Sequence, residues 1–337
     1  MDNLEPSGIR NDGLKTQHPI VTQEYGVYTP PIHEFFATTR EWIDNRVPGG
    51  YVFGPSRYGK SRAVKTWMKA LIDETYGGAI PFFRLVYKNH DRVHEQEFLA
   101  EILTAIRHRY SASTKRAERL KRIVNFFCSK ARNLGGNYVV IMIDEAQNMR
   151  DLEYRWLCNI QNDMDELGFR LTVISVGSQE LAYQHELFSM GQDIHLMGRF
   201  MVRNARFHGI RSSEEMEYVL QAYDSQTEWP AGSGITFTQY YFPRAYAADF
   251  RIAAYAAVLW DIFYDLAPTH YRPYLEVPME HIARSVESLF RKFGASTDHL
   301  VEFDEPILRA AVERTQYAAH MRTVARIPLK KSAKAPV

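Results

Sequence analysis

The stretch YVFGPSRYGKSRAVKTW, residues 51–67, decides the fold that this sequence predicts. A short apolar run is followed by a glycine, four further residues and then Gly-Lys-Ser, which is the pattern of a phosphate-binding loop. Backbone N–H groups in such a loop converge on one place, and glycine leaves room for the phosphate. The helix predicted after the loop adds its positive N-terminal end. The candidate binding residues are Gly54, Pro55, Ser56, Arg57, Tyr58, Gly59, Lys60, Ser61 and Arg62.

Two side chains of this loop suit a nucleoside triphosphate. Lys60 can reach the β- and γ-phosphates of ATP, and the Ser61 hydroxyl can ligate Mg²⁺. The alternative is a chance match in a glycine-containing turn. A strand predicted before the loop and a helix predicted over 60–74 favour the phosphate site, because this is the context in which the pattern binds phosphate.

An acidic pair ends the clearest buried strand of the chain, NYVVIMID at 137–144. This run is apolar on both faces, which is typical of a strand inside a parallel sheet. Because ligands bind at the carboxyl edge of such sheets, we expect Asp144 to hold Mg²⁺, directly or through water. We expect Glu145 to orient and activate the water that attacks the γ-phosphate. The alternative is a solvated acidic pair that caps the next helix.

A second apolar strand with a polar end, LTVISVG at 171–177, precedes Ser178 and Gln179. If this strand is the neighbour of the acidic one, Ser178 can contact the γ-phosphate or the attacking water. The alternative for Ser178 is an N-cap of the following helix, because serine is favoured at that position.

Strands and helices alternate along the first part of the chain. This alternation predicts βαβ units and hence an α/β fold with a parallel sheet flanked by helices. The predicted strands are 51–53, 79–87, 137–144, 171–177 and, more weakly, 201–210, and the predicted helices are 33–46, 60–74, 93–110, 113–133 and 151–167.

The pattern changes near residue 211, after which the chain is predicted to be helical. Ser212 to Glu215 form a capping box that opens a helix, and further helices are predicted at 244–266, 278–293 and 304–320. We therefore predict four parts. They are an N-terminal extended arm (1–32), the α/β domain (33–211), a helical lid or C-terminal domain (212–320) and a basic flexible tail (321–337).

The motifs GPSRYGKS (54–61) and MIDEAQ (142–147), followed by a strand with a polar end and an Arg-Phe pair, resemble those of the AAA+ ATPases. The resemblance covers roughly residues 30–265, and the DEAQ form and the arginine in the loop point to the transposon-encoded TnsC and TniB type of regulator. Initiator and clamp-loader ATPases resemble the chain more distantly. The resemblance implies the AAA+ P-loop NTPase fold, with ATP bound between subunits.

The resemblance also implies two arginines that act on the nucleotide. In this family an arginine of one subunit reaches the γ-phosphate of its neighbour, and Arg199 lies where the family has this finger, with Arg203 as a substitute. The family also has a sensor arginine on a lid helix, for which Arg251 is the candidate and Arg244 a competitor. The alternatives are a surface arginine paired with a helix end for Arg199 and a residue at the edge of the core for Arg251.

Two basic segments are candidates for contact with DNA. Residues 106–122 are rich in Lys, Arg and His, and in related ATPases this region grips the DNA backbone in a central channel. The chain after Glu313 carries cations and no carboxylate, which suits a tether to DNA or to a partner. The alternatives are a solvated helix face and a disordered solubilising tail. The predicted phosphate contacts are Lys115, Arg116, Arg119, Lys121 and Arg122.

The composition is that of an ordinary globular protein, with 45% hydrophobic and 24% charged residues. A net charge of +1 argues against a uniformly basic nucleic-acid binder but does not exclude a local basic patch. Two cysteines are too few for a disulfide framework, and with a polar N-terminus they favour a cytoplasmic location. The apolar run near 250–263 contains Arg251 and Asp261, so we expect a buried helix and no membrane span.

Together these features predict a Mg²⁺-dependent ATPase that assembles as a ring or helical filament on double-stranded DNA. By resemblance it would regulate DNA transposition and link a target-selection protein to the transposase. One alternative is a helicase-loader-like or other protein-remodelling ATPase. Another is a nucleotide-gated switch that does not bind DNA.

Overall fold

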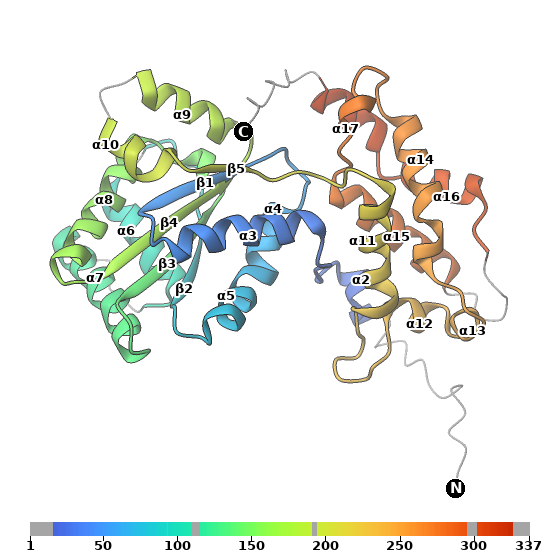
Figure 1. The fold of residues 1–337 in the computed structure, drawn as a ribbon, viewed down its shortest axis with the longest axis horizontal. Coiled ribbons are helices and arrows are strands. Elements are labelled where there is room, and N and C mark those ends of the chain that lie inside the picture. The colour runs from blue at the N-terminus through green and yellow to red at the C-terminus, as the bar shows by residue number, and fades with distance from the viewer. Residues whose placement is uncertain (1–15, 93, 109–114, 191–193, 295–301, 326–337) are drawn as a thin grey trace, which may run out of the picture. The chain divides into compact units, whose positions relative to one another are not determined.

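The computed structural model describes residues 16–92, 94–108, 115–190, 194–294 and 302–325. The chain divides into two compact units (Figure 1). One unit is Pro31–His208, and the other combines Met1–Pro30 with Gly209–Val337. We call them the sheet unit and the helical unit.

A five-stranded parallel sheet lies at the centre of the sheet unit, with the strand order β2-β3-β4-β1-β5. All seven residues of β3 are buried, as expected for a central strand covered on both faces. The sheet confirms the predicted α/β class. The strands are β1 (Gly49–Phe53), β2 (Phe82–Val86), β3 (Tyr138–Asp144), β4 (Arg170–Gly177) and β5 (Asn204–Arg206).

Helices cover both faces of the sheet (Figure 1). On β3, Val139, Ile141 and Ile143 join one apolar cluster with α6, α7 and α8, while Val140 and Met142 alternate with them and are buried on the other face. The helices of this unit are α3 (Pro30–Asp44), α4 (Lys60–Ala63), η1 (Val64–Met68), α5 (Lys69–Tyr76), α6 (Glu95–Ala105), α7 (Arg116–Asn133), η2 (Ala146–Asn148), α8 (Asp151–Glu166), α9 (Glu180–Met190), α10 (Ile194–Leu196) and η3 (Met197–Met201).

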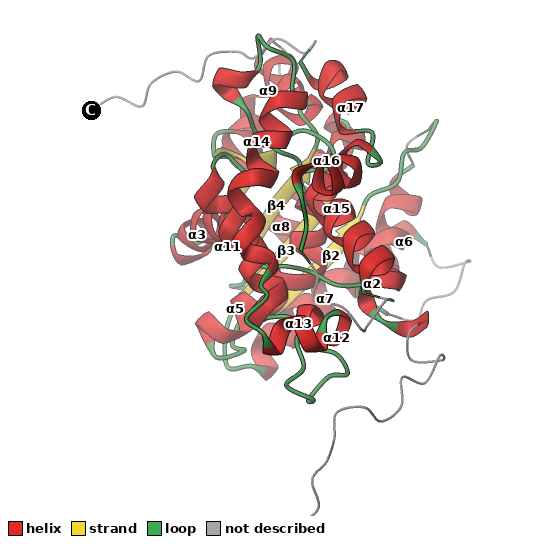
Figure 2. Ribbon diagram, turned by 90° about the vertical axis from the view of Figure 1, so that its right-hand side faces the viewer, coloured by secondary structure: helices red, strands yellow, loops and turns green. Residues whose placement is uncertain are grey.

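The helical unit is built around one apolar core. Its helices are drawn in red in Figure 2. Ser212 caps its first long helix, since the Glu215 N–H donates to the Ser212 hydroxyl oxygen at 3.2 Å. The elements of this unit are α2 (Pro19–Thr22), α11 (Ser213–Ser225), α12 (Phe237–Tyr241), α13 (Pro243–Ala247), η4 (Ile252–Tyr255), α14 (Ala256–Leu266), η5 (Arg272–Tyr274), α15 (Met279–Phe293), α16 (Glu305–Glu313) and α17 (Tyr317–Val324).

Two of the long helices predicted in this unit are broken. The predicted helix 244–266 is interrupted between α13 and η4, where Asp249 has a φ of 68°. The predicted helix 304–320 is interrupted at Gln316, which has a φ of 61°. A residue in the left-handed region ends an α-helix, and helical periodicity on both sides of such a residue hides the break.

The N-terminal segment joins the helical unit, although the sequence predicts an extended arm. Ile20 and Val27 are part of the apolar core. The Gln23 amide and the Tyr25 hydroxyl donate to the two carboxylate oxygens of Glu287, at 2.7 and 3.0 Å. These contacts hold the described part of the arm, residues 16–30, against α15.

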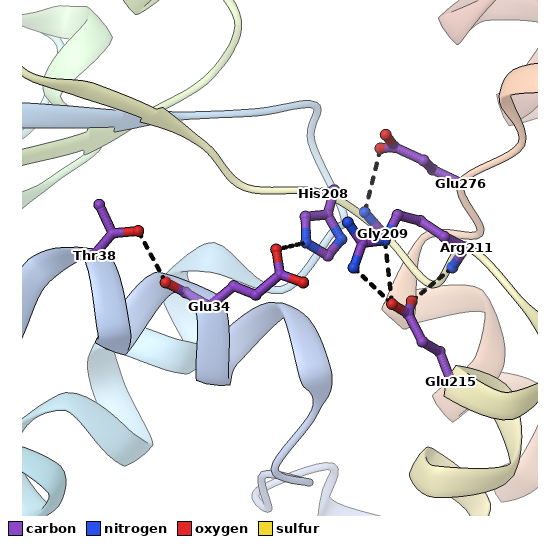
Figure 3. A network of polar contacts seen from close by, with 7 residues as sticks. All are labelled: Glu34, Thr38, His208, Gly209, Arg211, Glu215 and Glu276. Atoms are coloured by element: carbon purple, nitrogen blue, oxygen red, sulfur yellow. Dashed lines mark hydrogen bonds and ion pairs between the residues drawn. The ribbon is translucent and has the colours of Figure 1, made fainter. Parts of the chain in front are cut away.

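The chain passes from the sheet unit to the helical unit between His208 and Gly209, close to the boundary predicted near 211. Figure 3 shows the polar contacts on each side of this point. The His208 ring lies 2.6 Å from a carboxylate oxygen of Glu34, within the sheet unit. The Gly209 N–H donates to Glu276 at 3.3 Å, and Arg211 pairs with Glu215, within the helical unit.

Two of the remaining predictions concern the tail and the membrane. The predicted flexible tail begins inside α17, where Met321 and Val324 are buried, so residues 321–324 are helical. Residues 326–337 lie outside the described part of the chain. In the part that is described, no helix combines the length and the apolar character needed to cross a membrane.

Candidate functional site

The loop after β1 is fixed at both ends by the backbone. The Gly54 N–H donates to the Gly177 carbonyl at 3.3 Å, which joins the carboxyl ends of β1 and β4. A Cβ at Gly54 would lie 2.3 Å from the Phe207 carbonyl oxygen, so only glycine fits there. Gly59 has a φ of 105° directly before α4, a conformation that favours glycine. Both glycines are therefore required by the path of the chain itself.

The other loop residues differ in exposure. Tyr58 is buried and anchors the loop, whereas Ser56 and Arg57 are exposed. Pro55 and Arg62 are half-buried, Arg62 on the first turn of α4. The loop thus lies over the carboxyl edge of the sheet and leads directly into α4, as the sequence predicts.

The Lys60 ammonium lies inside the loop. It donates to the carbonyl oxygens of Gly54 and Pro55, each at 2.7 Å, and the residue is buried. Burial lowers the pKa of Lys60 to about 8, while the carboxylates of Glu145 and Asp144 act in the opposite direction. A cation held this close to the loop backbone is placed to meet a phosphate group bound there.

Ser61 and Asp144 meet at the edge of the sheet, although 83 positions separate them. The Ser61 hydroxyl donates to Asp144 Oδ1 at 3.0 Å, and the Asp144 carboxylate is 3% exposed. A hydroxyl and a carboxylate oxygen side by side are the ligand types that Mg²⁺ uses, together with phosphate oxygens and water. The two residues therefore fit a magnesium ion bound with a triphosphate.

Arg84 is a member of this site that sequence reasoning missed. It lies on β2, and its Nη2 donates to Asp144 Oδ2 at 2.8 Å. The sequence contains one indication of this role, because Arg84 is the only charged residue in the apolar strand AIPFFRLVY. A charge in a buried strand is normally paired, so a partner could have been expected.

Gln147 connects Glu145 to the end of β4, and it too was missed. Its amide nitrogen donates to Glu145 Oε2 at 2.7 Å, and its amide oxygen accepts from the Ser178 N–H at 3.0 Å. Glu145 is exposed and has a φ of 60°, at the turn between β3 and η2. The predicted base and the predicted polar tip of β4 are thus joined by one side chain.

Ser178 also shows the capping arrangement that was its alternative interpretation. Its hydroxyl oxygen accepts from the Glu180 N–H at 3.3 Å, at the start of α9. Contact of Ser178 with a nucleotide stays a prediction.

Arg199 lies near the amino end of β1, whereas the phosphate-binding loop follows the carboxyl end of this strand. Its carbonyl oxygen lies next to Gly49, the first residue of β1, and its guanidinium is 3.5 Å from Gln161 Oε1. A five-residue strand is about 16 Å long, so Arg199 does not reach the loop of its own chain. Action of Arg199 on a nucleotide bound to a second copy stays a prediction. Arg203, its substitute, is exposed.

Arg251 is not on a helix, so that part of the sensor prediction is wrong. Its backbone is extended (φ −136°, ψ 134°) before η4. Its guanidinium donates to the carbonyls of Tyr246 and Phe250, at 3.0 and 2.7 Å, and stacks on the Tyr246 ring at 3.8 Å. These local contacts explain its position at the edge of the core. Arg244 is exposed on α13.

The basic segment supplies fewer exposed cations than predicted. Arg119 is buried and donates to the Gln96 carbonyl at 2.6 Å, so its assignment as a phosphate contact is corrected. Arg116 pairs with Glu95, and Arg122 pairs with Glu118 one helical turn away. Lys115 and Lys121 are exposed at the beginning of α7. Residues 109–114 of this segment lie outside the described part of the chain.

Apart from Ser61 and Asp144, the histidine and acidic side chains of the described residues do not form a metal centre. The His90 Nε2 atom lies 2.7 Å from Glu101 Oε1, so His90 already has a carboxylate partner. Within the described ranges, no group of three or more His, Cys, Asp or Glu side chains is arranged to hold a metal ion.

Comparison with known proteins defines the class of this fold. Residues 48–184 match a family model described as AAA domain. The chain is similar to the Aeropyrum pernix ORC2 protein in its ADPNP–ADP complexes, with a TM-score of 0.60, 10% identity and coverage of 93% of this chain and 75% of that one. No curated protein sequence matches it.

Two further solved structures are similar at a TM-score of 0.51. One is a Walker-type ATPase of Pyrococcus abyssi, at 14% identity, covering 87% of this chain and 74% of the other. The second is the Aeropyrum pernix ORC1 protein in complex with DNA, at 11% identity, covering 92% and 72%. With the sheet order and the loop after β1, these likenesses establish the AAA+ P-loop NTPase fold with a C-terminal helical region.

Proposed function

We propose that this chain binds ATP with Mg²⁺ and hydrolyses it. The observation that carries the proposal is the convergence of Lys60, Ser61 and Asp144 at the carboxyl edge of one parallel sheet. The same fold holds ADPNP and ADP in the Aeropyrum pernix ORC2 protein.

Each residue has a chemical task in this proposal. Lys60 would exchange its two carbonyl partners for phosphate oxygens, and its charge would stabilise the transferring phosphoryl group. Ser61 and Asp144 would hold the magnesium ion, whose charge would neutralise the β- and γ-phosphate oxygens. Glu145 would accept a proton from the attacking water, and the Gln147 amide would orient the Glu145 carboxylate.

The wider role we propose is that of a DNA transposition regulator. Subunits would assemble on double-stranded DNA as a ring or filament, with Arg199 of one copy acting at the loop of the next. The exposed Lys115 and Lys121 would contact the DNA backbone, and the Aeropyrum pernix ORC1 protein provides an example of this fold in complex with DNA. The resemblance of the DEAQ motif and the loop to the TnsC and TniB regulators supports links to a transposase and a target-selection protein, in the cytoplasm.

Two single substitutions test the nucleotide site. We expect Lys60→Ala to abolish binding of a fluorescent ATP analogue, because the loop loses its cation. We expect Glu145→Gln to keep binding and lose turnover, because only the group that activates water is removed. Normal ATP affinity in the Lys60 variant, or unchanged turnover in the Glu145 variant, would contradict the assignment.

Sedimentation with and without ATP and duplex DNA separates this role from the alternatives. Assembly that needs both ATP and DNA supports the transposition regulator. Assembly with ATP that is indifferent to DNA supports a nucleotide-gated switch. A defined complex with a replicative helicase supports a loader or remodelling ATPase.

A further inference from the structure

We propose that Arg84 is a positioning residue that makes metal binding depend on the nucleotide. Its guanidinium holds the Asp144 carboxylate beside Ser61 and competes with a free divalent cation for that carboxylate. The proposal rests on the proposed function, since it takes Ser61 and Asp144 as the ligands of the magnesium ion that accompanies ATP.

The sheet register places Arg84 where it can act on Asp144. Arg84 pairs with Met142 on β3, so its side chain lies on the same face of the sheet as Met142 and Asp144. The Arg84 side chain is 27% exposed and the Asp144 carboxylate is 3% exposed. Their ion pair is therefore screened much less by solvent than a surface pair.

The contacts of the carboxylate show what a metal ion would meet. Asp144 Oδ1 accepts from the Ser61 hydroxyl at 3.0 Å and from the Glu145 N–H at 3.2 Å. Asp144 Oδ2 accepts from Arg84 at 2.8 Å. A cation that coordinates this carboxylate directly must share it with a guanidinium or displace the guanidinium. Two positive charges on one carboxylate oppose each other, which weakens the binding of a free ion.

A triphosphate reverses this effect. The Asp144 and Glu145 carboxylates interact electrostatically with Lys60, and Asp144 also pairs with Arg84. An ion bound with ATP arrives with an excess of negative charge, which both cations attract. Arg84 thus disfavours the ion alone and not the ion with its triphosphate, so the metal is taken up with the nucleotide.

One donor of Arg84 argues against a purely structural ion pair. Within the described residues, the Arg84 Nε–H is buried and has no hydrogen-bond partner. An arginine that served only to bind β2 to β3 would be expected to have its buried donors satisfied. The unsatisfied donor is consistent with a guanidinium that changes partners during function.

Binding of Mn²⁺, used as a spectroscopic substitute for Mg²⁺, tests the proposal in the full chain. Free Mn²⁺ is measured by electron paramagnetic resonance for the wild type, Arg84→Gln and Arg84→Lys without nucleotide. We expect Arg84→Gln to bind Mn²⁺ at least roughly tenfold more tightly, since loss of a charge at this distance changes the affinity of a carboxylate for a cation by about that factor or more. Arg84→Lys, which keeps the charge, should stay closer to the wild type.

The double variant Arg84→Gln with Asp144→Asn is the matched control, and it should lose the gain. Equal Mn²⁺ affinity in Arg84→Gln and the wild type, or a gain that survives in the double variant, overturns the proposal. If Arg84→Gln does not fold, the wild type decides, because the proposal is overturned if it binds Mn²⁺ as tightly without a nonhydrolysable ATP analogue as with one. Binding of a fluorescent ATP analogue to the wild type is measured separately, so failure of the proposed function is distinguished from failure of this inference.

Discussion

Lys60 is a buried cation whose charge is set by its surroundings. Its ammonium is held by two loop carbonyls, and burial lowers its pKa to about 8. A lysine in water stays charged beyond pH 10, so this residue is unusual in losing its charge near physiological pH. The affinity of the loop for phosphate should therefore be higher when Lys60 is charged than when it is neutral.

We therefore expect ATP affinity to fall as the pH rises above about 8. The free protein then loses the Lys60 proton while the complex retains it, because a bound phosphate favours the ammonium, and the affinity drops by up to about tenfold per pH unit. Binding of a nonhydrolysable ATP analogue between pH 7 and 9.5 measures this. Lys60→Arg, which stays charged over that range, should give a flat profile. If the affinity falls equally with pH in the wild type and in Lys60→Arg, the Lys60 proton is not the cause of the pH dependence.

His18 is a second residue whose surroundings oppose its charge. Its ring is buried among Trp229, Phe237, Tyr240 and Tyr241, and its Nδ1 accepts from the Ile20 N–H at 3.0 Å. Burial lowers the pKa of His18 from 6.5 to about 4. The folded state therefore disfavours the imidazolium, and no acid among these neighbours compensates for it.

We expect His18 to make the protein less stable in mild acid. The unfolded chain binds the proton below pH 6.5 and the folded chain only near pH 4, so stability present above pH 6.5 is lost as the pH falls, by at most about 3 kcal/mol. The free energy of unfolding of the wild type relative to His18→Phe should shrink from pH 7 to pH 4.5. The exposed Gln17→Ala change, which removes no titratable group, should show no such trend. A constant difference for His18→Phe would contradict the mechanism.

At the scale of elements, the turn after β3 and the end of β4 act as one piece. The Gln147 amide spans them, and a Cβ at Gly177 would lie 2.5 Å from its oxygen, so glycine at the end of β4 leaves room for this amide. The Gln184 amide on α9 also donates to the Gln147 carbonyl at 2.6 Å. A shift of β4 or α9 would therefore be transmitted to Glu145.

Gln147→Ala should consequently lower turnover without weakening ATP binding. Glu145 would lose the donor that orients it, and we expect kcat to fall about tenfold, a fraction of what a complete general base contributes. Steady-state hydrolysis and equilibrium binding of an ATP analogue separate the two effects. Asn148→Ala, on the same turn, should leave kcat near that of the wild type. A fall in affinity with unchanged kcat would assign Gln147 to nucleotide binding instead.

At the scale of the whole molecule, a site completed by a second copy can be tested by mixing two inactive proteins. Arg199→Ala keeps its own loop and Glu145, and Glu145→Gln keeps Arg199. In a mixed assembly, Arg199 of the second protein would act at the intact loop of the first. We expect an equal mixture to regain up to about a quarter of wild-type turnover, since head-to-tail contacts form at random.

Each variant alone should remain inactive in that experiment. Recovery that requires ATP-dependent assembly would place Arg199 between subunits. No recovery, with both proteins co-sedimenting in one assembly, would show that Arg199 does not act between subunits. The position of Arg199 beside Gly49, away from the loop, makes the first outcome the expected one.

The sequence by itself determined the elements that depend on local pattern. The phosphate-binding loop, the buried strand ending in Asp144 and the Ser212 cap each follow from neighbouring residues, and their period or spacing is specific. The parallel sheet follows from the alternation of strands and helices. Asp144 was also predicted to lie near Ser61, because carboxyl ends of parallel strands meet at one edge.

The tertiary structure decided which distant side chains pair. Arg84 meets Asp144 across 60 positions, and Tyr25 meets Glu287 across 262. Arg119 turns into the protein instead of toward solvent, although it belongs to a charged run. Such contacts depend on strand register and on how helices rotate against the core, and a periodic pattern specifies a buried face without specifying the partner of each side chain.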